Sequence, residues 1–377
     1  MRAASRMDGI DRTLIRQIFD SAPPGAINLG LGQPDLPTPA LAAAAGIAGI
    51  TAGRTFYTST AGDPGLRAAI AGRYPGFASG PENVVVTVGS QEAMFAAALT
   101  LVDAGDEILY PDPGYPAYVV VARLIGASGV PYPLRPEREF RIDPGDVESR
   151  LTERTRLVIV CSPSNPTGGV NREEEVAALA RLLERRGVAW LSDEIYGGFC
   201  YDGVVPSLTQ ASREGGIVIS GIAKDVSMTG WRIGWAAGPA AIIARVIAAH
   251  QYLVTCAPSV SQWAALATFT PEGEAERARY LEIFRRRRAL MAAELAKIPR
   301  LKFGMPAGAF YFFVDASAYG PSLALAKRIL ERRKVVTIPG EAFGSNGAGY
   351  LRISYAASEA DIIEGLRRIG EELAAGE

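Results

Sequence analysis

The sequence of 377 residues predicts an α/β protein with a mainly parallel sheet, followed by a smaller α+β unit. The first observation is a series of short runs that are apolar at consecutive positions, as in strands covered by helices on both faces. The second is that amphipathic stretches separate several of these runs, a pattern typical of parallel sheets. The third is a change after Pro271, where a long charged helix precedes several short strands.

The predicted strands of the main sheet lie in the middle of the chain. They are Val84–Val88, Glu107–Tyr110, Leu157–Cys161, Ala189–Ser192, Ile217–Ser220 and Ile233–Ala237. The clearest helices among them are Ser90–Val102 and Glu173–Arg186. The elements predicted for the C-terminal part are Pro271–Ile298, Gly308–Val314, Ser322–Arg333, Val335–Pro339, Leu351–Tyr355 and a last helix from Ser358.

Composition argues against several classes of function. Lys+Arg number 39 and Asp+Glu 40, so the net charge is −1, whereas nucleic-acid-binding proteins usually carry a clustered positive excess. The run Arg285–Arg288 lies among acidic residues and is interpreted as a solvated helix face. The single histidine, His250, excludes a multi-histidine zinc site, and no metal site is predicted.

The cysteines and the apolar stretches bear on location. Cys161, Cys200 and Cys256 are far apart and show no CxxC spacing, as expected in a reducing compartment. The apolar stretches Leu41–Ala52 and 234–249 are too short or too interrupted to span a bilayer. The acidic N-terminal residues do not fit a signal peptide. The sequence therefore predicts a cytoplasmic protein that binds neither membranes nor nucleic acids.

Lys224 is the first candidate for chemistry. It follows the predicted strand Ile217–Ser220 in small and apolar surroundings, where a lysine loses hydration and its pKa falls. A lowered pKa is what a Schiff-base nucleophile needs. The alternative is a lysine that extends from a loop into solvent.

Polar residues also follow three other predicted strands. Asp193 could pair with a cationic pyridine nitrogen, and Tyr196 could donate to a phenolate oxygen, although Asp193 could instead cap a helix. The turn 162–169 presents Asn165 at another strand end. Ser90 is predicted as the N-cap of its helix, whose free N–H groups would suit a phosphate.

Together these motifs resemble the class I/II aminotransferases, which are fold type I pyridoxal-5′-phosphate (PLP) enzymes, and in particular the bacterial aspartate/aromatic aminotransferase-like subfamily. The resemblance covers nearly the whole chain in order. Its motifs are Gly30–Asp35 with Thr38–Pro39, Tyr57 with Gly62 and Leu66–Arg67, Asp112–Tyr118, Asn165–Gly168, Asp193–Tyr196, Lys224 with Thr229–Gly234, Pro306–Tyr311, Pro339–Gly344 and Tyr350–Ser354.

The resemblance implies that PLP is the cofactor and that Lys224 holds it as a Schiff base, then moves a proton during the reaction. Asp193 would keep the pyridine nitrogen protonated. Asn165 and Tyr196 would bond the ring oxygen O3′, and Tyr115 would stack on the ring. Lys224, Asp193 and Tyr196 are thus the implied catalytic residues.

The same resemblance implies a phosphate site. The backbone N–H groups of Ser90 and Gln91 would hold the phosphate together with the guanidinium of Arg232. Ser220 is a further cofactor-binding candidate. The family often has its serine three residues before the lysine, where this chain has Gly221.

Substrate and subunit contacts are implied as well. Arg352 would bind the α-carboxylate of the substrate, helped by Asn165 and the backbone of Gly32. Tyr57 matches a position that reaches the phosphate of the neighbouring subunit, which implies a homodimer with shared active sites.

The fold implied is a large PLP-binding domain, residues 41–275, around a mainly parallel seven-stranded sheet. Residues 1–40 and 276–377 would form a small α+β domain. A PLP-sensing regulator would carry a DNA-binding domain before this fold, and the sequence ahead of Gly30–Asp35 is too short for one.

The activity implied is transfer of an amino group from an L-amino acid to a 2-oxo acid such as 2-oxoglutarate. Neutral or aromatic donors are favoured over aspartate. Aspartate-preferring bacterial members often have a lysine where this chain has Gln91. The alternative is another PLP reaction on the same fold, such as a C–S β-lyase, because one fold hosts many chemistries.

Overall fold

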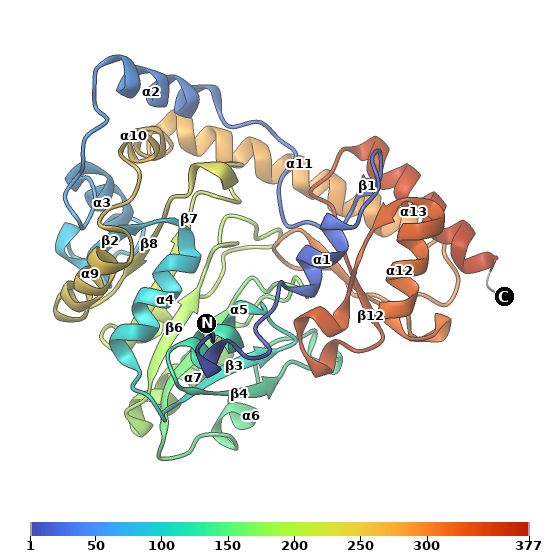
Figure 1. Ribbon diagram of the computed structural model, residues 1–377, viewed down its shortest axis with the longest axis horizontal. Coiled ribbons are helices and arrows are strands. Elements are labelled where there is room, and N and C mark those ends of the chain that lie inside the picture. The colour runs from blue at the N-terminus through green and yellow to red at the C-terminus, as the bar shows by residue number, and fades with distance from the viewer. Residues whose placement is uncertain (1, 376–377) are drawn as a thin grey trace.

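The computed structural model describes residues 2–375, and its large part is built on a seven-stranded sheet (Figure 1). In spatial order the strands are β2 (Val84–Thr87), β8 (Gly234–Ala237), β7 (Gly216–Gly221), β6 (Ala189–Asp193), β5 (Thr155–Cys161), β3 (Glu107–Asp112) and β4 (Ser128–Pro133). Strands β3 to β7 run parallel, and β8 is antiparallel to both of its neighbours. The predicted α/β class with a mainly parallel sheet is confirmed.

Helices cover both faces of this sheet, because successive strand residues point to opposite faces and both sets are apolar. Leu157 and Ile159 of β5 share a core with α4 (Gly89–Leu101), α5 (Ala117–Leu124) and α9 (Ala240–Val254). Val158 and Val160 share another with α3 (Pro64–Ala71), α7 (Glu173–Arg186) and α10 (Ser259–Ala267). The other helices of this part are α2 (Ala40–Thr51), against α10, and α6 (Pro144–Glu148) and α8 (Leu208–Ala211), both against α7.

The small part is assembled from both ends of the chain (Figure 1). Its antiparallel sheet has the order β11 (Ile338–Pro339), β12 (Tyr350–Ser354), β9 (Tyr311–Asp315). Beside it, β1 (Ile27–Asn28) pairs in parallel with β10 (Val335–Val336). The helices of this part are α1 (Leu14–Asp20), α11 (Pro271–Leu295), α12 (Ser322–Arg333) and α13 (Glu359–Ala374).

The two parts have largely separate apolar cores, which supports the proposed division into residues 41–275 and residues 1–40 with 276–377. Helix α11 runs from the neighbourhood of α10 to α13, so the proposed boundary at residue 275 falls inside a helix (Figure 1). On this helix Arg287 is buried and donates two hydrogen bonds, of 2.6 and 2.9 Å, to Asp35. The interpretation of Arg285–Arg288 as a solvated helix face was therefore wrong for Arg287, whereas Arg286 is exposed.

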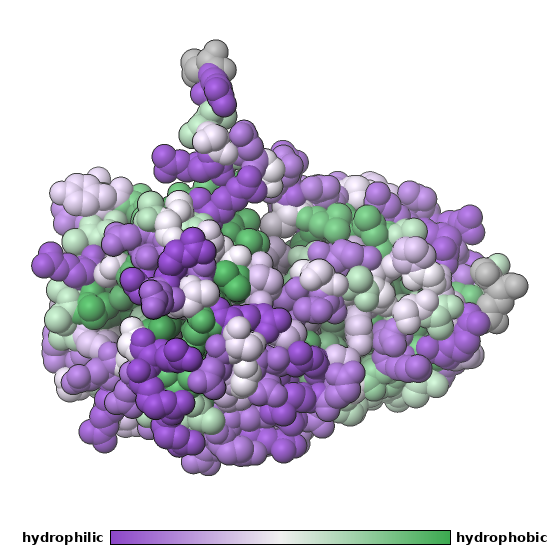
Figure 2. All heavy atoms as spheres, turned by 90° about the horizontal axis from the view of Figure 1, so that it is seen from below, coloured by the Kyte–Doolittle hydropathy of each residue, from purple (hydrophilic) through white to green (hydrophobic). Residues whose placement is uncertain are grey.

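The surface has a projecting segment. Figure 2 shows that the chain ahead of α1 stands out from the rest of the molecule. Within residues 2–375, no helix combines the length and the apolar character needed to cross a membrane.

Candidate active site

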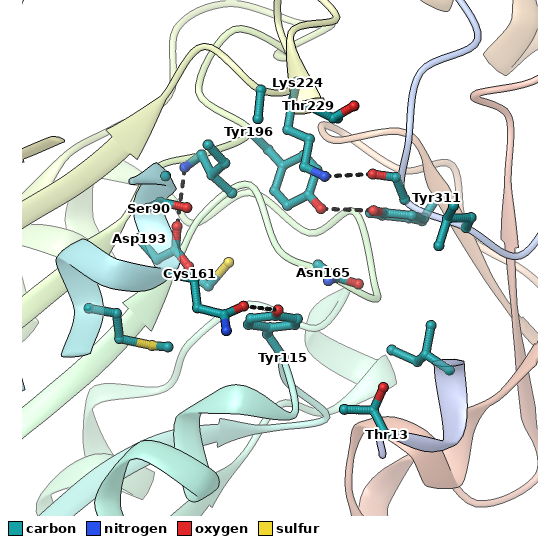
Figure 3. A pocket seen from close by; sticks show the side chains of 18 of the residues that line it. Thr13, Ser90, Tyr115, Cys161, Asn165, Asp193, Tyr196, Lys224, Thr229 and Tyr311 are labelled. Carbon is teal, nitrogen blue, oxygen red and sulfur yellow. Dashed lines mark hydrogen bonds between the residues drawn. The ribbon is translucent and has the colours of Figure 1, made fainter. Parts of the chain in front are cut away.

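A cavity of about 300 Å³ lies where the carboxyl ends of the large-sheet strands meet the small part (Figure 3). Strands β5 and β6 end in Cys161 and Asp193, and the turn after β7 carries Lys224. Strands β9 and β12 of the small part contribute Tyr311 and Arg352. Parallel strands end at one edge of their sheet, so residues distant in sequence converge here.

Lys224 points its amine across the cavity. Its Nζ donates a hydrogen bond of 2.5 Å to the backbone carbonyl of Gly32 (Figure 3). Burial lowers the pKa of Lys224 to about 8, and the positive charges of Arg352 and Arg232 act in the same direction. Asp193 opposes this shift. The loss of hydration predicted for Lys224 is therefore present in the folded chain.

Asp193 is a buried carboxylate. Burial raises its pKa to about 6, and hydrogen bonds from the Tyr118 hydroxyl and the Ile195 N–H limit the rise. These bonds measure 2.8 and 3.2 Å. The next helix, α8, begins only at Leu208, so Asp193 caps no following helix. Tyr118 was not predicted as a site residue, although it closes the motif Asp112–Tyr118.

The turn from β2 into α4 forms an anion site. Helix α4 begins at Gly89, and its N-cap is Val88, whose side chain accepts no capping bond. The prediction of Ser90 as N-cap was wrong, and Ser90 lies in the first turn. The first N–H groups of a helix have no partner within it. A Cβ at Gly89 (φ +79°) would lie 2.7 Å from Nη2 of Arg232, so glycine makes room for this guanidinium.

Three tyrosines form hydrogen bonds at the cavity wall (Figure 3). The Tyr115 hydroxyl donates to Oε1 of Gln91 at 2.9 Å. The hydroxyls of Tyr196 and Tyr311 are 2.8 Å apart. Burial raises the pKa of both these phenols, which therefore keep their protons at neutral pH. Tyr311 was quoted in a motif but was not predicted as a site residue.

Arg352 is a buried cation without a buried anion beside it. Its Nη1 donates to Oδ1 of Asn165 at 2.7 Å, and its Nη2 donates to the carbonyl of Gly30 at 2.5 Å. The guanidinium lies 4.4 and 4.6 Å from the ring centres of Tyr311 and Phe343. Among residues 2–375 no carboxylate forms an ion pair with Arg352, and burial lowers its pKa. Such a group favours an anionic ligand.

Two predicted cofactor residues do not face this cavity. The Ser220 hydroxyl donates to the backbone carbonyl of Glu194 at 3.0 Å and lines a separate cleft. The Ser220 side chain is therefore turned away from this cavity, because a shift of one position along a strand turns a side chain to the opposite face, and its contact with the cofactor stays a prediction. Tyr57 is exposed and outside the cavity of its own chain, so its contact with a second subunit stays a prediction.

The N-terminal segment adds lining residues that the sequence did not reveal. Thr13, Ile15 and Arg16 reach the cavity from the start of α1. Gly32, which was predicted from the sequence, also lines it, and a Cβ there would lie 2.2 Å from the Tyr311 hydroxyl. The capping Thr13 before a short amphipathic stretch was the available signal for α1.

Comparisons with known proteins agree with this geometry. Residues 24–369 match the family model described as aminotransferase class I and II. The aspartate/prephenate aminotransferase of Thermus thermophilus is 36% identical over 354 residues, 92% of this chain and 91% of that protein. The aspartate aminotransferase of Pyrococcus horikoshii is 34% identical over 378 residues, 98% of this chain and 97% of that protein. The structure of the Thermus thermophilus aspartate aminotransferase with maleate has a TM-score of 0.92 at 32% identity, covering 99% and 100% of the two chains.

Enzymes of this family use PLP, and the cavity has the chemistry that this group requires. The open amides of α4 and the guanidinium of Arg232, with the space left by Gly89, suit a phosphate. A buried amine with a lowered pKa and a buried carboxylate suit an aldehyde and a pyridine nitrogen. Because the match extends over nearly the whole chain and the fold and cavity agree with it, this chain belongs to the class I and II aminotransferases and is a PLP-dependent transaminase of fold type I.

Proposed function

We propose that this aminotransferase takes the amino group from a neutral or aromatic L-amino acid and passes it to a 2-oxo acid such as 2-oxoglutarate, in a ping-pong reaction. The observation that carries the proposal is the buried guanidinium of Arg352, which has no carboxylate partner among the described residues and shares a cavity with Lys224. The α-carboxylate of either substrate would supply the missing charge, and the planar fork of an arginine suits it.

Lys224 is proposed to carry the proton between the substrate Cα and C4′ of the cofactor. Its pKa of about 8 keeps a useful fraction of the amine neutral, and thus able to accept a proton, near neutral pH. Bound PLP supplies an electron sink for the negative charge that develops at Cα. With a pKa of about 6, Asp193 is largely ionised at pH 7 and would hold a proton on the ring nitrogen.

The remaining residues would fix the ring and the phosphate. Asn165 accepts from Arg352 through its carbonyl, so its NH₂ group is the donor toward the ring oxygen O3′. Tyr196 keeps its proton and would donate to the same oxygen. Tyr115 would stack on the ring. The first amides of α4, at Ser90 and Gln91, would bind the phosphate with Arg232, where a helix N-terminus favours negative charge.

The donor preference rests on the charges around the cavity. Gln91 is neutral at a position where the resemblance places a lysine in aspartate-preferring members. Among the described lining residues, the cation not yet assigned is Arg16, which is exposed and pairs with Asp20 at 3.0 Å. A second carboxylate would have to draw Arg16 away from Asp20, and an unpaired buried charge is costly. A neutral side chain avoids this cost, although relatives are named for aspartate.

The test is a donor series assayed with 2-oxoglutarate. We expect kcat/KM for leucine or phenylalanine to exceed that for aspartate by about tenfold or more. Gln91→Lys should raise the aspartate value, and Gln91→Met, of similar size without charge, should not. An aspartate value well above the others would overturn the donor preference, and its loss in Arg16→Gln would identify Arg16 as the missing cation.

We also propose a cytoplasmic homodimer with shared active sites. The support is a set of large aromatic side chains that face solvent in the single chain, since such surfaces are usually covered by a partner. They are Phe56, Tyr57 and Tyr252, which are 83%, 87% and 88% exposed. Light scattering at assay concentration should give twice the chain mass of 39.9 kDa. A fully active monomer would contradict the proposal.

A further inference from the structure

The only histidine of the sequence, His250, lies behind the proposed phosphate site. It is on α9, which packs against α4, and its side chain is 0% exposed. Its Nδ1 donates to Oε1 of Glu92 at 2.8 Å. Within residues 2–375, its Nε2 has no hydrogen-bond partner, so Glu92 alone anchors this imidazole.

Glu92 connects the histidine to the turn before α4. Its second carboxylate oxygen, Oε2, accepts the N–H of Val88 at 2.8 Å. Val88 is the N-cap, and its own side chain accepts no hydrogen bond from the helix. Gly89 follows with φ +79°, and this turn directs the next amides. Glu92 therefore holds the turn on one side, while Arg232 packs against Gly89.

We propose that His250 is a positioning residue for PLP, acting on the phosphate site through Glu92. The hydrogen bond from His250 fixes the carboxylate in the rotamer that clamps Val88, so the amides of Ser90 and Gln91 stay where the phosphate needs them. Without the histidine, Oε1 of Glu92 loses its hydrogen-bond partner in a site where the side chain is 12% exposed. The positioning role rests on the proposed phosphate site, and it identifies His250 and Glu92 as the two residues that hold that site in place.

The experiment titrates apoenzyme with PLP and with pyridoxal, which lacks the phosphate, and follows binding by absorbance. We expect His250→Leu to weaken PLP about tenfold, the usual effect of losing a hydrogen bond to a charged group, and to change pyridoxal less than about twofold. His250→Asn keeps an N–H near the Nδ1 position and should restore most of the affinity. Gln251→Leu, an exposed neighbour on α9, is the matched control and should bind both ligands normally.

A second variant tests whether the effect passes through Glu92. Glu92→Ala should weaken PLP selectively, by about tenfold or more, and adding His250→Leu should cause no further loss, because both act through one contact. If His250→Leu does not fold, Glu92→Ala against Glu92→Gln carries the test, since the amide keeps an acceptor for Val88. Additive losses, or equal weakening of PLP and pyridoxal, would overturn the inference.

Arg232→Leu separates this inference from the proposed phosphate site. If that variant weakens PLP and pyridoxal equally, the phosphate assignment itself fails, and the inference fails with it. If it is selective for PLP while His250→Leu has no effect, the phosphate site stands and only the positioning role of His250 is refuted.

Discussion

The two walls of the active-site cavity are built in different ways. On one wall, Ser90, Asp193 and Lys224 lie at or just beyond strand ends of the large sheet, so a single framework holds them. On the other, Gly32 and Arg352 come from opposite ends of the chain and meet in the small part. The groups proposed to act on the cofactor are thus fixed relative to one another, whereas the position of Arg352, the arginine proposed to bind the substrate carboxylate, depends on how the two parts pack.

The most damaging change should be Lys224→Ala, which removes the reactive group of the large-sheet wall. We expect the visible absorption of covalently held PLP to disappear and kcat to fall by about 10⁴-fold, because a positioned base and nucleophile are lost together. Lys302→Ala, at an exposed lysine, should leave both unchanged. Retained near-wild-type transamination in Lys224→Ala would show that the proposed lysine is the wrong one.

Arg352→Leu tests the opposite wall. We expect kcat/KM to fall by about 10²- to 10³-fold for every amino donor, because a buried charge pair with the α-carboxylate can no longer form. PLP affinity should stay within about threefold. Arg352→Lys should have a kcat/KM between those of the wild-type enzyme and Arg352→Leu, since lysine keeps the charge but lacks the planar fork. A large loss of PLP affinity in Arg352→Leu would mean that the two walls do not divide their roles in this way.

The rate at which apoenzyme captures PLP should report the environment of Lys224. The neutral amine attacks, and with a pKa of about 8 its fraction rises about tenfold from pH 7 to pH 9 and then levels off. A lysine with an ordinary pKa near 10.4 would gain about a hundredfold over the same range and continue to rise. Stopped-flow absorbance at fixed PLP concentration distinguishes the two curves.

Tyr118→Phe should have the smallest effect. The Tyr118 hydroxyl stabilises the charged form of Asp193, so its loss raises the pKa of Asp193 further above 6. We expect kcat at pH 7 to fall about fivefold, and the difference to shrink above pH 8 as the carboxylate ionises again. Tyr132→Phe, which removes a buried hydroxyl bonded to a backbone carbonyl, is the control and should not move the pH profile. An unshifted profile in Tyr118→Phe would refute the coupling.

The contrast between the large sheet and the small part, which is assembled from both ends of the chain, also explains which parts of the fold the sequence predicts. The buried strands of the large sheet contain runs of consecutive apolar residues, which are visible locally. The edge strand β4, Ser128–Pro133, was not predicted, because Gly129, Pro131 and Pro133 interrupt it and most of it is not fully buried. Strand β1 has two residues and exists through its pairing with Val335 and Val336, which no local pattern reveals.

The site residues, too, were predictable where the signal was local and not where it depended on long-range packing. Lys224 and Asp193 were identifiable because a polar residue directly after a buried strand is a local signal. Tyr311 and Arg16 reach the cavity through packing between distant segments, and Ser220 lines a separate cleft because neighbouring strand positions face opposite ways. Contacts between residues that are distant in sequence therefore determine those site positions that the local sequence pattern does not reveal.

The parallel pairing of Ile27–Asn28 with Val335–Val336 also bears on the order in which the parts of the fold can form during synthesis. During synthesis the N-terminal strand leaves the ribosome first, but its partner is made only when nearly the whole chain exists. The large sheet, whose strands all lie between residues 84 and 237, can assemble in the meantime. Pairing these two strands closes the long loop between them, and the entropy cost of closing that loop delays the pairing. We therefore expect the wall that carries Arg352 to form last, and a prematurely terminated chain to hold the lysine without the arginine.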